Sequence, residues 1–421
     1  MQSGDASSTQ PSGGESSSRS SDAAAPEPTP PSERIVSLDV LRGVAVLGIL
    51  MVNVWVFAMP EATLLNPTVY GDFSGVNYWA WLLGHVFFQE KFITLFSVLF
   101  GAGVVLFMSS EKRSASTSLR LHYRRSIWLV LIGLAHAYLL WYGDILVAYG
   151  ICALWIVALR TWPPTRQLLV GIALIAVPSI LEVAAALTVP PELVAELWRP
   201  AEATIRAEVA AYRGGWIEQF DHRAAAAWER QTTGFVGATV WRVGGSMLLG
   251  MAVFKWGVLS AERSRGFYRG LVAAGAVAGL VPILAGVAYI EANDWTGAAG
   301  VFWRQFNYWG SLPLAASYIG IVALWCLRWP SGVVTDALAA VGRTAFTNYL
   351  LQTVLATSIF YGHGLGLFGR LARVELLGVV VAIWAIQIPL SVLWLRRFRF
   401  GPVEWLWRTL TYGERQPLRT R

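Results

Sequence analysis

The chain has 421 residues, of which 55% are hydrophobic and only 14% are charged, and it contains 21 Trp. This composition excludes a typical soluble domain, in which about a quarter of residues are charged, and indicates a polytopic membrane protein. The net charge of +7 does not require a nucleic-acid partner, because the basic residues fall where membrane topology and anionic headgroups would place them.

The N-terminal stretch is rich in Ser, Pro, Gly and Ala and contains no continuous apolar segment. A signal peptide would need an apolar core of about 7–15 residues. Segments of this composition do not bury enough apolar surface to fold. We therefore expect residues 1–33 to form a disordered tail and residues 34–400 to form a helical bundle.

Long apolar runs recur along the chain from residue 36 onward. A bilayer core about 30 Å thick is crossed by roughly 20 apolar residues in a helix, so the sequence predicts an all-α integral membrane bundle of about ten transmembrane helices. The expected spans are 36–59, 79–109, 126–141, 145–160, 167–188, 236–257, 270–290, 309–327, 344–361 and 375–395. The second is longer than one crossing needs, which predicts a tilted or broken helix.

The basic residues fall mainly on one side of this predicted topology. With the tail in the cytoplasm, most of the 33 Lys and Arg residues lie in cytoplasmic connections or in the C-terminal segment. Cytoplasmic loops of membrane proteins carry such an excess of positive charge. We therefore expect both termini to be cytoplasmic, an even number of spans, and a multi-pass protein embedded in the lipid bilayer of the cell membrane.

Two segments outside the predicted spans are amphipathic. Residues 189–235 carry apolar residues at helical spacing among mixed charges, which predicts one or two helices on the outer membrane surface or over an outer cavity. This loop is either a solvated lid or a substrate-selecting element. Residues 401–421 include Trp405, Trp407 and Arg408, which are typical of an amphipathic segment at the cytoplasmic interface.

The two cysteines, Cys152 and Cys326, fall within predicted spans and form no Cys-x-x-Cys pair. The sequence therefore indicates neither a disulfide framework nor a zinc site, and we expect no metal and no bound cofactor.

Charged residues near the start of the first predicted span need an explanation. Asp39 and Arg42 are three residues apart on one helical face, near the cytoplasmic end. A charge at the centre of a span costs roughly 2.5–3.5 kcal/mol, and less near its end, where long side chains reach the interface. The two residues predict either an ion pair that fixes the depth of the helix or part of a cytoplasmic anion-binding site.

Several stretches of the chain resemble a known family. They are "RIVSLDVLRGVAVLGILMVN" (34–53), "EKFITLFSVLFGAG" (90–103), "GDILVAYGI" (143–151), "GRTAFTNYLLQ" (342–352) and "GPVEWLWRTLTYGERQPL" (401–418). Together they resemble the YeiB-like bacterial membrane proteins, and the first of them also resembles the opening span of the transmembrane acyltransferase superfamily. The resemblance covers roughly residues 35–418.

The superfamily resemblance implies acyl transfer, commonly from a cytoplasmic acyl-CoA as co-substrate to a hydroxyl or amino acceptor. The acceptor would be a small molecule or a lipid-linked one, such as a glycan, a glycolipid or a secondary metabolite.

The resemblance also implies site residues. In one branch of the superfamily a catalytic His ends the first-span motif, whereas this chain has Asn53 there. The branch that resembles heparan-glucosaminide N-acetyltransferase also has Asn at that place and carries its working His later, before an acidic residue. His85 and Glu90 match that pattern with a shorter spacing, so the resemblance implies a catalytic role for both.

Chemistry gives an independent reason to consider histidine. Acyl transfer to a hydroxyl or amine needs a base that takes the acceptor proton, and His suits this task near neutral pH. Of the five histidines, His85 and His136 fall within predicted spans. Each predicts either a general base or a structural hydrogen-bonding partner, and His85 is the preferred base.

A polar stripe opens the ninth predicted span. Arg343, Thr347, Asn348 and Gln352 lie near one helical face at its cytoplasmic end. Polar residues within spans commonly bridge neighbouring helices. The stripe predicts either such bridging or a donor site, in which Arg343 and Asn348 would act with Arg42 and Asp39.

Two classes of function follow. The first is an acyltransferase in which the donor enters from the cytoplasm and His85 assists attack by the acceptor. The alternative is a transporter or channel for a small solute or lipid, in which intramembrane polar residues relay protons or ions. The residues of that relay would be Asp39, Glu90, Lys91, His136 and Asp144.

Overall fold

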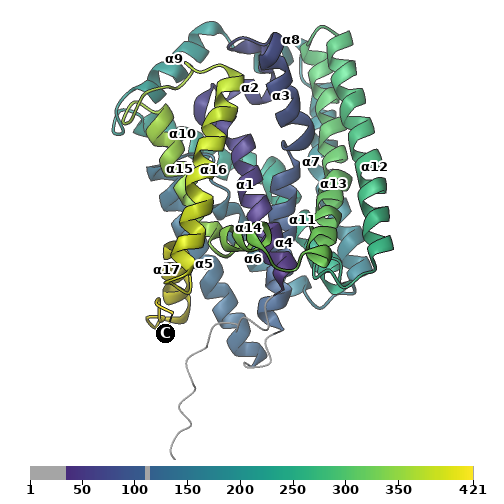
Figure 1. Ribbon diagram of the computed structural model, residues 1–421. Helices are drawn as coiled ribbons and strands as arrows, with labels where there is room; N and C mark the ends of the chain where they lie inside the picture. Colours follow the sequence, from purple (N-terminus) through teal and green to yellow (C-terminus); the bar gives the residue numbers. More distant parts are fainter. Residues whose placement is uncertain (1–34, 110–113, 421) are drawn as a thin grey trace, which may run out of the picture. The chain divides into compact units, whose positions relative to one another are not determined.

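The computed structural model of the chain describes residues 35–109 and 114–420. Its helices all belong to the unit Val36–Arg421. The predicted disordered tail, residues 1–33, lies outside the described residues. Within the described ranges no β-strand forms, and the one strand-like pairing is an isolated bridge between Phe398 and Arg419. The prediction of an all-α fold is therefore confirmed (Figure 1).

In chain order the helices are α1 (Val36–Ala58), α2 (Ala62–Leu65), η2 (Pro67–Val69), α3 (Gly75–Phe87), α4 (Lys91–Met108), α5 (Ala115–Leu139), α6 (Leu146–Ile156), η3 (Val157–Leu159), α7 (Pro164–Thr188), α8 (Pro191–Trp198), α9 (Glu202–Arg213), α10 (Phe220–Gln231), η4 (Phe235–Thr239), α11 (Val240–Lys255), α12 (Arg265–Ala292), α13 (Gly297–Arg328), α14 (Val333–Arg343), α15 (Ala345–Phe360), α16 (Arg373–Leu395) and α17 (Pro402–Tyr412).

Seven stretches of the described chain are long and apolar enough to cross a membrane. They are α1, α3 with α4, α7, the stretch Phe220–Lys255 that ends with α11, α12, α13 and α16. Every predicted span contains a helix. Three predicted spans fall outside the seven stretches, and their helices are α5, which carries arginines in its first half, α6 with 11 residues, and α15 with 16. The described residues thus form several helices that could cross a membrane, whereas the number of crossings stays a prediction.

Helix α1 is the most enclosed of the seven. In its most apolar stretch 72% of the residues are buried, compared with 17% for α7 and 28% for α12 and α16. Figure 1 shows α1 in the middle of the bundle, and it contacts α4, α14, α15 and α16. The outer helices α12 and α13 lie side by side along most of their length.

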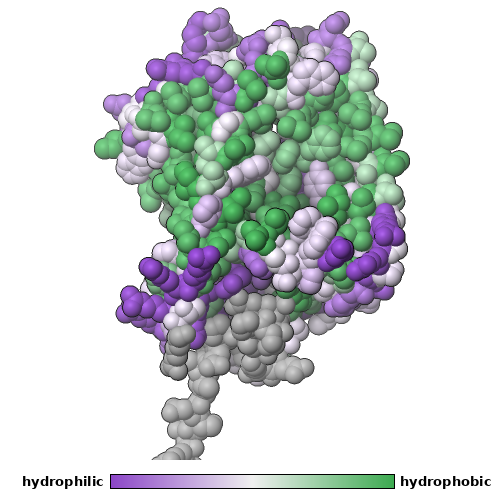
Figure 2. All heavy atoms as spheres, in the orientation of Figure 1, coloured by the Kyte–Doolittle hydropathy of each residue, from purple (hydrophilic) through white to green (hydrophobic). Residues whose placement is uncertain are grey.

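The outer helices present apolar side chains to their surroundings. Exposed examples are Ile180 and Leu187 on α7, Val277 and Val281 on α12, and Val381 on α16. Figure 2 shows hydrophobic residues across the middle of the visible face, with hydrophilic residues gathered at its two ends. A continuous apolar band far exceeds the patches that soluble monomers expose, and its place between two polar ends is that of the hydrocarbon core around a membrane bundle.

Two helix pairs approach so closely that only glycine fits between them. A Cβ added to Gly342 of α14 would lie 1.8 Å from the carbonyl oxygen of Asp39, and one added to Gly43 of α1 would lie 2.0 Å from a carbonyl oxygen of α14. Gly101 and Gly250 create the same contact between α4 and α11. Small residues permit such close packing in membranes. The first and fourth family motifs therefore lie against each other.

The long predicted span 79–109 is broken, as its length indicated. Helix α3 ends at Phe87 and α4 begins at Lys91. Glu90, between them, has a φ of 70°, a left-handed conformation that costs a non-glycine residue about 1–2 kcal/mol. Strained residues of this kind cluster at functional sites, so the break is a candidate position for one.

The segment 189–235 forms three helices, α8, α9 and α10, rather than the one or two that the sequence predicts. The C-terminal segment contains α17, in agreement with its amphipathic pattern. Helix α14 falls in none of the predicted spans.

Candidate functional site

His85 lies in the last turn of α3, directly before the break. Its side chain is buried, and its ring is stacked between Trp81 and Trp303, with ring centroids 5.0 Å and 5.1 Å away and interplanar angles of 19° and 18°. Trp303 comes from α13, so residues far apart in the sequence hold the imidazole on both faces. This arrangement fixes the plane of the ring.

The edge of the His85 ring contacts two amide side chains through Nδ1. Its Nδ1 lies 2.8 Å from Oε1 of Gln89, one turn later, whereas the amide nitrogen of Asn307 lies farther away, at 3.4 Å. Because an amide oxygen only accepts, the shorter contact is satisfied when the proton is on Nδ1, and we assign that tautomer. The Nε2 atom then carries a lone pair, and it has no hydrogen-bond partner among the described residues.

A pocket borders this histidine. Its wall includes His85 and Gln89, together with Trp55, Thr63 and Arg373. Arg373, in the first turn of α16, is held by the carbonyl oxygens of residues 67, 70 and 72. The pocket thus combines aromatic surface with a few fixed polar groups.

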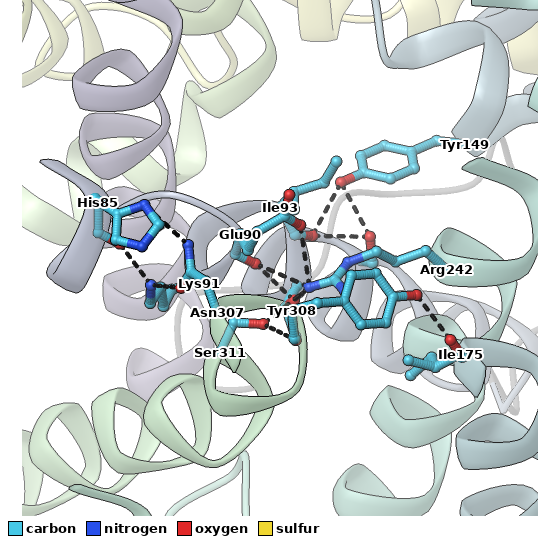
Figure 3. A network of polar contacts seen from close by, with 12 residues as sticks. His85, Glu90, Lys91, Ile93, Tyr149, Ile175, Arg242, Asn307, Tyr308 and Ser311 are labelled. Carbon is cyan, nitrogen blue, oxygen red and sulfur yellow. Dashed lines mark hydrogen bonds and ion pairs between the residues drawn. The ribbon is translucent and has the colours of Figure 1, made fainter. Parts of the chain in front are cut away.

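Lys91 opens α4 directly after the break and is fully buried. Its ammonium donates to the carbonyl oxygen of His85 at 2.8 Å and to the side-chain oxygen of Asn307. The carbonyl of His85 belongs to the last turn of α3, where cations are favoured by the helix dipole. Lys91 therefore terminates α3 and ties it to α13 next to the imidazole (Figure 3).

Glu90 is paired with Arg242 of α11, whose guanidinium lies 3.2 Å from the carboxylate. Arg242 also donates to Thr94 and to Ser311, at 3.2 Å and 2.9 Å, and lies 4.0 Å above the ring of Tyr308. Figure 3 shows His85 and Arg242 on either side of the break. The acid that the resemblance places beside His85 is thus engaged with an arginine.

Asp39 and Arg42 form the ion pair that their spacing predicts, with 3.0 Å between the charged atoms. Their side chains are 14% and 31% exposed, so the pair lies at the rim of α1 rather than deep within the bundle. Arg343 is half-buried at the end of α14, near this rim because Gly342 touches Asp39. The structure brings these three residues to one end of the bundle, and anion binding there stays a prediction.

Asn348 is buried, and its amide group bridges helices. It donates to Thr344 at 3.0 Å and to Ser391 of α16 at 2.9 Å, and the backbone carbonyl oxygen of Asn348 accepts from Gln387 at 2.8 Å. These contacts match the bridging interpretation of the stripe, and a donor-binding role for Asn348 stays a prediction.

His136 of α5 makes hydrogen bonds through both ring nitrogens. Nδ1 lies 2.7 Å from the carboxylate of Asp144, and Nε2 lies 2.9 Å from the hydroxyl of Thr353 on α15. Asp144 also accepts the backbone N–H of Val147 at 2.9 Å. The imidazole is therefore fully engaged, unlike that of His85. Asn53, the remaining polar residue of interest, is half-buried in α1.

Sequence reasoning missed the α13 residues of this site. Asn307 and Ser311 are four residues apart, and both are buried on the face of α13 that meets α4 and α11. A polar pair at helical spacing inside an apolar run is the signal that could have identified them. Trp303, four residues before Asn307, continues the same face.

The fold and site define a class of protein: a helical bundle with apolar crossing helices and buried polar groups at a broken helix. Residues 253–414 match the family described as "Protein of unknown function (DUF418)". The chain is 36% identical to the uncharacterised protein YeiB of Escherichia coli strain K12, over 90% of this chain and 96% of the relative. It is 32% identical to the uncharacterised protein YxaH of Bacillus subtilis strain 168, over 93% and 98%.

A third relative, an uncharacterised 39.9 kDa protein from the amylase 3′ region of Bacillus acidopullulyticus, is 26% identical over 92% of this chain and 96% of its own. The chain belongs to the DUF418 family, to which the resemblance to YeiB-like proteins pointed. The matched stretch 253–414 begins near the end of α11 and does not include His85 or Glu90.

Proposed function

We propose that this protein is an integral-membrane acyltransferase in which His85 is the general base. The observation that carries the proposal is the Nε2 atom of His85, which has no partner among the described residues, on a ring that borders a pocket. Both faces of the ring are fixed by tryptophan and its other nitrogen is held by Gln89. A base held in one tautomer and one plane is suited to a defined proton transfer.

The reaction is the transfer of an acyl group from a thioester such as acyl-CoA. The hydroxyl or amine of the acceptor attacks the thioester carbonyl while its proton passes to Nε2. The carbon–sulfur bond then breaks, and the proton moves from the imidazolium to the leaving thiolate, which restores neutral His85. Arg42 and Arg343 would attract the anionic part of the donor at the other end of α1.

The proposal includes a topology of ten crossings with both termini in the cytoplasm, in the cell membrane. Two contacts support the placement of both ends of the bundle's chain on one side. The start of α1 touches α14 through Asp39 and Gly342, and the start of α15 is tied to α17, because Glu404 accepts the N–H of Phe346 at 2.7 Å. Since α14 runs directly into α15, α1 begins at the end of the bundle where α17 lies. Reporter fusions after Arg421 and after residue 215 should report cytoplasmic and outer locations.

The test of the reaction uses the purified full-length chain in detergent with labelled acetyl-CoA and palmitoyl-CoA and a membrane extract as the source of acceptors. Labelled acceptor should form, and His85→Ala should lower the rate by about 10²–10⁴-fold. The matched control is His122→Ala, because His122 is also buried and also has one ring nitrogen without a partner among the described residues, but it does not line the pocket. Equal rates for the wild type and His85→Ala would exclude the base, and absence of any labelled product would exclude the reaction.

Transport is the second candidate, and the buried ionisable groups Lys91, His136 and Asp144 favour it. Such groups mark proton and ion pathways in membranes. Proteoliposomes separate the two proposals, because proton-dependent uptake of a solute without labelled product is expected of a transporter alone.

A further inference from the structure

A second cluster of buried polar side chains lies apart from His85, where α9 and α10 meet the ends of α5 and α15. It contains Tyr142, Tyr212, Tyr361 and Arg223, each no more than 1% exposed. The ring of Tyr212 lies 4.8 Å from that of Tyr361 and 6.1 Å from that of Tyr142. Four separate segments of the chain therefore contribute one residue each to this tyrosine–arginine cluster.

The backbone around the cluster is held in place. The N–H of Gly362 donates to the carbonyl of Tyr212 at 2.9 Å, and a Cβ on Gly362 would lie 1.9 Å from the carbonyl oxygen of Arg213. Arg223 donates through Nε to the carbonyl of Tyr138 at 2.8 Å, and this contact holds the guanidinium group in place. These contacts anchor Tyr212 to the segment that carries Tyr361, and Arg223 to the end of α5.

The polar tips of these side chains are unsatisfied. The hydroxyls of Tyr142, Tyr212 and Tyr361, and both terminal nitrogens of Arg223, are buried without a hydrogen-bond partner among the described residues. Buried polar groups in proteins are almost always hydrogen-bonded, and each exception is destabilising. Ordered water or a bound ligand must therefore supply the partners of these five groups.

The charges around the cluster indicate the sign of the charge that a ligand would carry. Arg223 forms no ion pair within the described residues, whereas the neighbouring Arg230 is paired with Glu61 at 2.5 Å. Glu208 accepts the N–H of Glu61 at 2.9 Å, and burial raises the pKa of its carboxyl to about 7, so it is partly protonated at neutral pH. The cluster therefore combines an unneutralised cation with hydroxyl donors, which favours an anion.

We propose that Arg223, Tyr142, Tyr212 and Tyr361 form a binding site for a tetrahedral oxyanion, the phosphate group of a free or lipid-linked ligand. The cluster offers five donor groups, whereas a carboxylate has only about four lone-pair positions on its two oxygens. A phosphate has three or four acceptor oxygens, each of which can accept more than one hydrogen bond, so it can engage all five donors. A guanidinium binds such oxygens in a fork geometry. The site shares no residue with the His85 pocket and does not depend on acyl transfer.

The experiment uses the full-length chain in detergent and HEPES buffer, with potassium chloride holding the ionic strength constant. Inorganic phosphate should bind saturably in calorimetry and raise the melting temperature, because a ligand of the folded state stabilises it. Tyr361→Phe should weaken phosphate binding about three- to tenfold, and Arg223→Gln more than tenfold. Arg206→Gln, which alters an exposed arginine of α9, should leave binding unchanged.

Arg223→Gln also removes the contact to Tyr138, so it could lower phosphate affinity through a change in structure. Tyr361→Phe and Tyr142→Phe each delete one oxygen only, and their phosphate affinities therefore provide an independent test. Tighter binding of a short-chain phosphatidic acid than of inorganic phosphate identifies a lipid headgroup as the source, and the reverse order identifies a soluble phosphate. Acetate that binds as well as phosphate overturns the proposal. So does phosphate affinity that is the same in the wild type and in all three variants.

Discussion

Arg242 and Glu90 form an ion pair with 3.2 Å between their charged atoms, although the two residues are 152 positions apart. The pair joins α11 to the break between α3 and α4, and the same guanidinium reaches Ser311 of α13. Lys91, the residue after Glu90, ties the break to α13 through Asn307. Two adjacent charged residues therefore hold the broken helix to two neighbours, and this fixes the position of His85.

Arg242→Ala should destabilise the bundle by about 1–3 kcal/mol, less than the roughly 3–5 kcal/mol of a fully buried pair, because Glu90 is partly exposed to solvent. The variant leaves Glu90 without its cation and opens space beside Tyr308. The measurement is the melting temperature of the purified protein in detergent.

Arg304→Ala is the matched control for Arg242→Ala, because Arg304 pairs with Glu182 at 2.7 Å while its side chain is 44% exposed. Exposed pairs contribute about 0–1 kcal/mol, so this variant should melt close to the wild type. A larger fall in melting temperature for Arg304→Ala than for Arg242→Ala would contradict the claim that the Arg242–Glu90 pair stabilises the break between α3 and α4.

Gly342→Ala should strongly reduce the amount of folded protein. Its new methyl group would lie 1.8 Å from the backbone oxygen of Asp39, so α1 and α14 must separate. Overpacking of this kind costs about 1–3 kcal/mol and occasionally more. Gly378→Ala on α16 is the control, because no atom lies within 4 Å of its added Cβ. Alanine is favoured over glycine in a helix by about 0.5–1 kcal/mol, so the control should melt no lower than the wild type.

The long helices were predictable because only helices satisfy the backbone across a lipid core, and apolar runs of about 20 residues leave few alternatives. Helix α14 was not predictable, since it has only 11 residues and its position depends on the contact of Gly342 with a helix some 300 positions earlier. Such a contact leaves no periodic trace in the sequence.

The candidate site was predictable only in part, for the same reason. The position of His85 in an apolar run is visible in the sequence, and so is the ion pair of Asp39 and Arg42 at helical spacing. The groups that hold the imidazole are not, because Asn307 lies 222 positions after His85 and Trp303 comes from the same distant helix. Tertiary packing decides these contacts, and helical periodicity does not encode them.

Glu208 predicts a pH dependence of stability. Burial and the nearby Glu61 raise the pKa of its carboxyl from 4.5 to about 7. Between these values the folded protein binds the proton more tightly than the unfolded chain, so the free energy of unfolding falls as pH rises from about 4.5 to 7 and stays low above. Glu208→Gln keeps an oxygen for the N–H of Glu61 and cannot ionise. Its melting temperature should therefore exceed that of the wild type at pH 8 and approach it at pH 5.

Glu202→Gln on the same helix is the control for this titration, because the Glu202 side chain is 79% exposed. Its melting curve should follow the wild type across the whole range. A wild-type protein that becomes more stable between pH 5 and pH 8, relative to Glu208→Gln, would contradict the raised pKa.

The last prediction separates the two intramembrane histidines. The side chains of His136 and Asp144 are 1% and 0% exposed, and the second ring nitrogen is bonded to Thr353. His136→Ala therefore leaves a buried carboxylate without its partner and should cost about 3–5 kcal/mol of stability. Asp144→Asn should lower the stability less than His136→Ala does, because an amide oxygen can still accept the N–H of Val147. His85→Ala should show a different profile, with some loss of stability from the cavity between the two tryptophans and a large loss of acyl transfer per folded molecule. The variants are compared by melting temperature and by activity normalised to the folded fraction. If His136→Ala kept the wild-type melting temperature but abolished activity, the hydrogen-bonded Asp144–His136–Thr353 chain, rather than His85, would be the site of proton transfer.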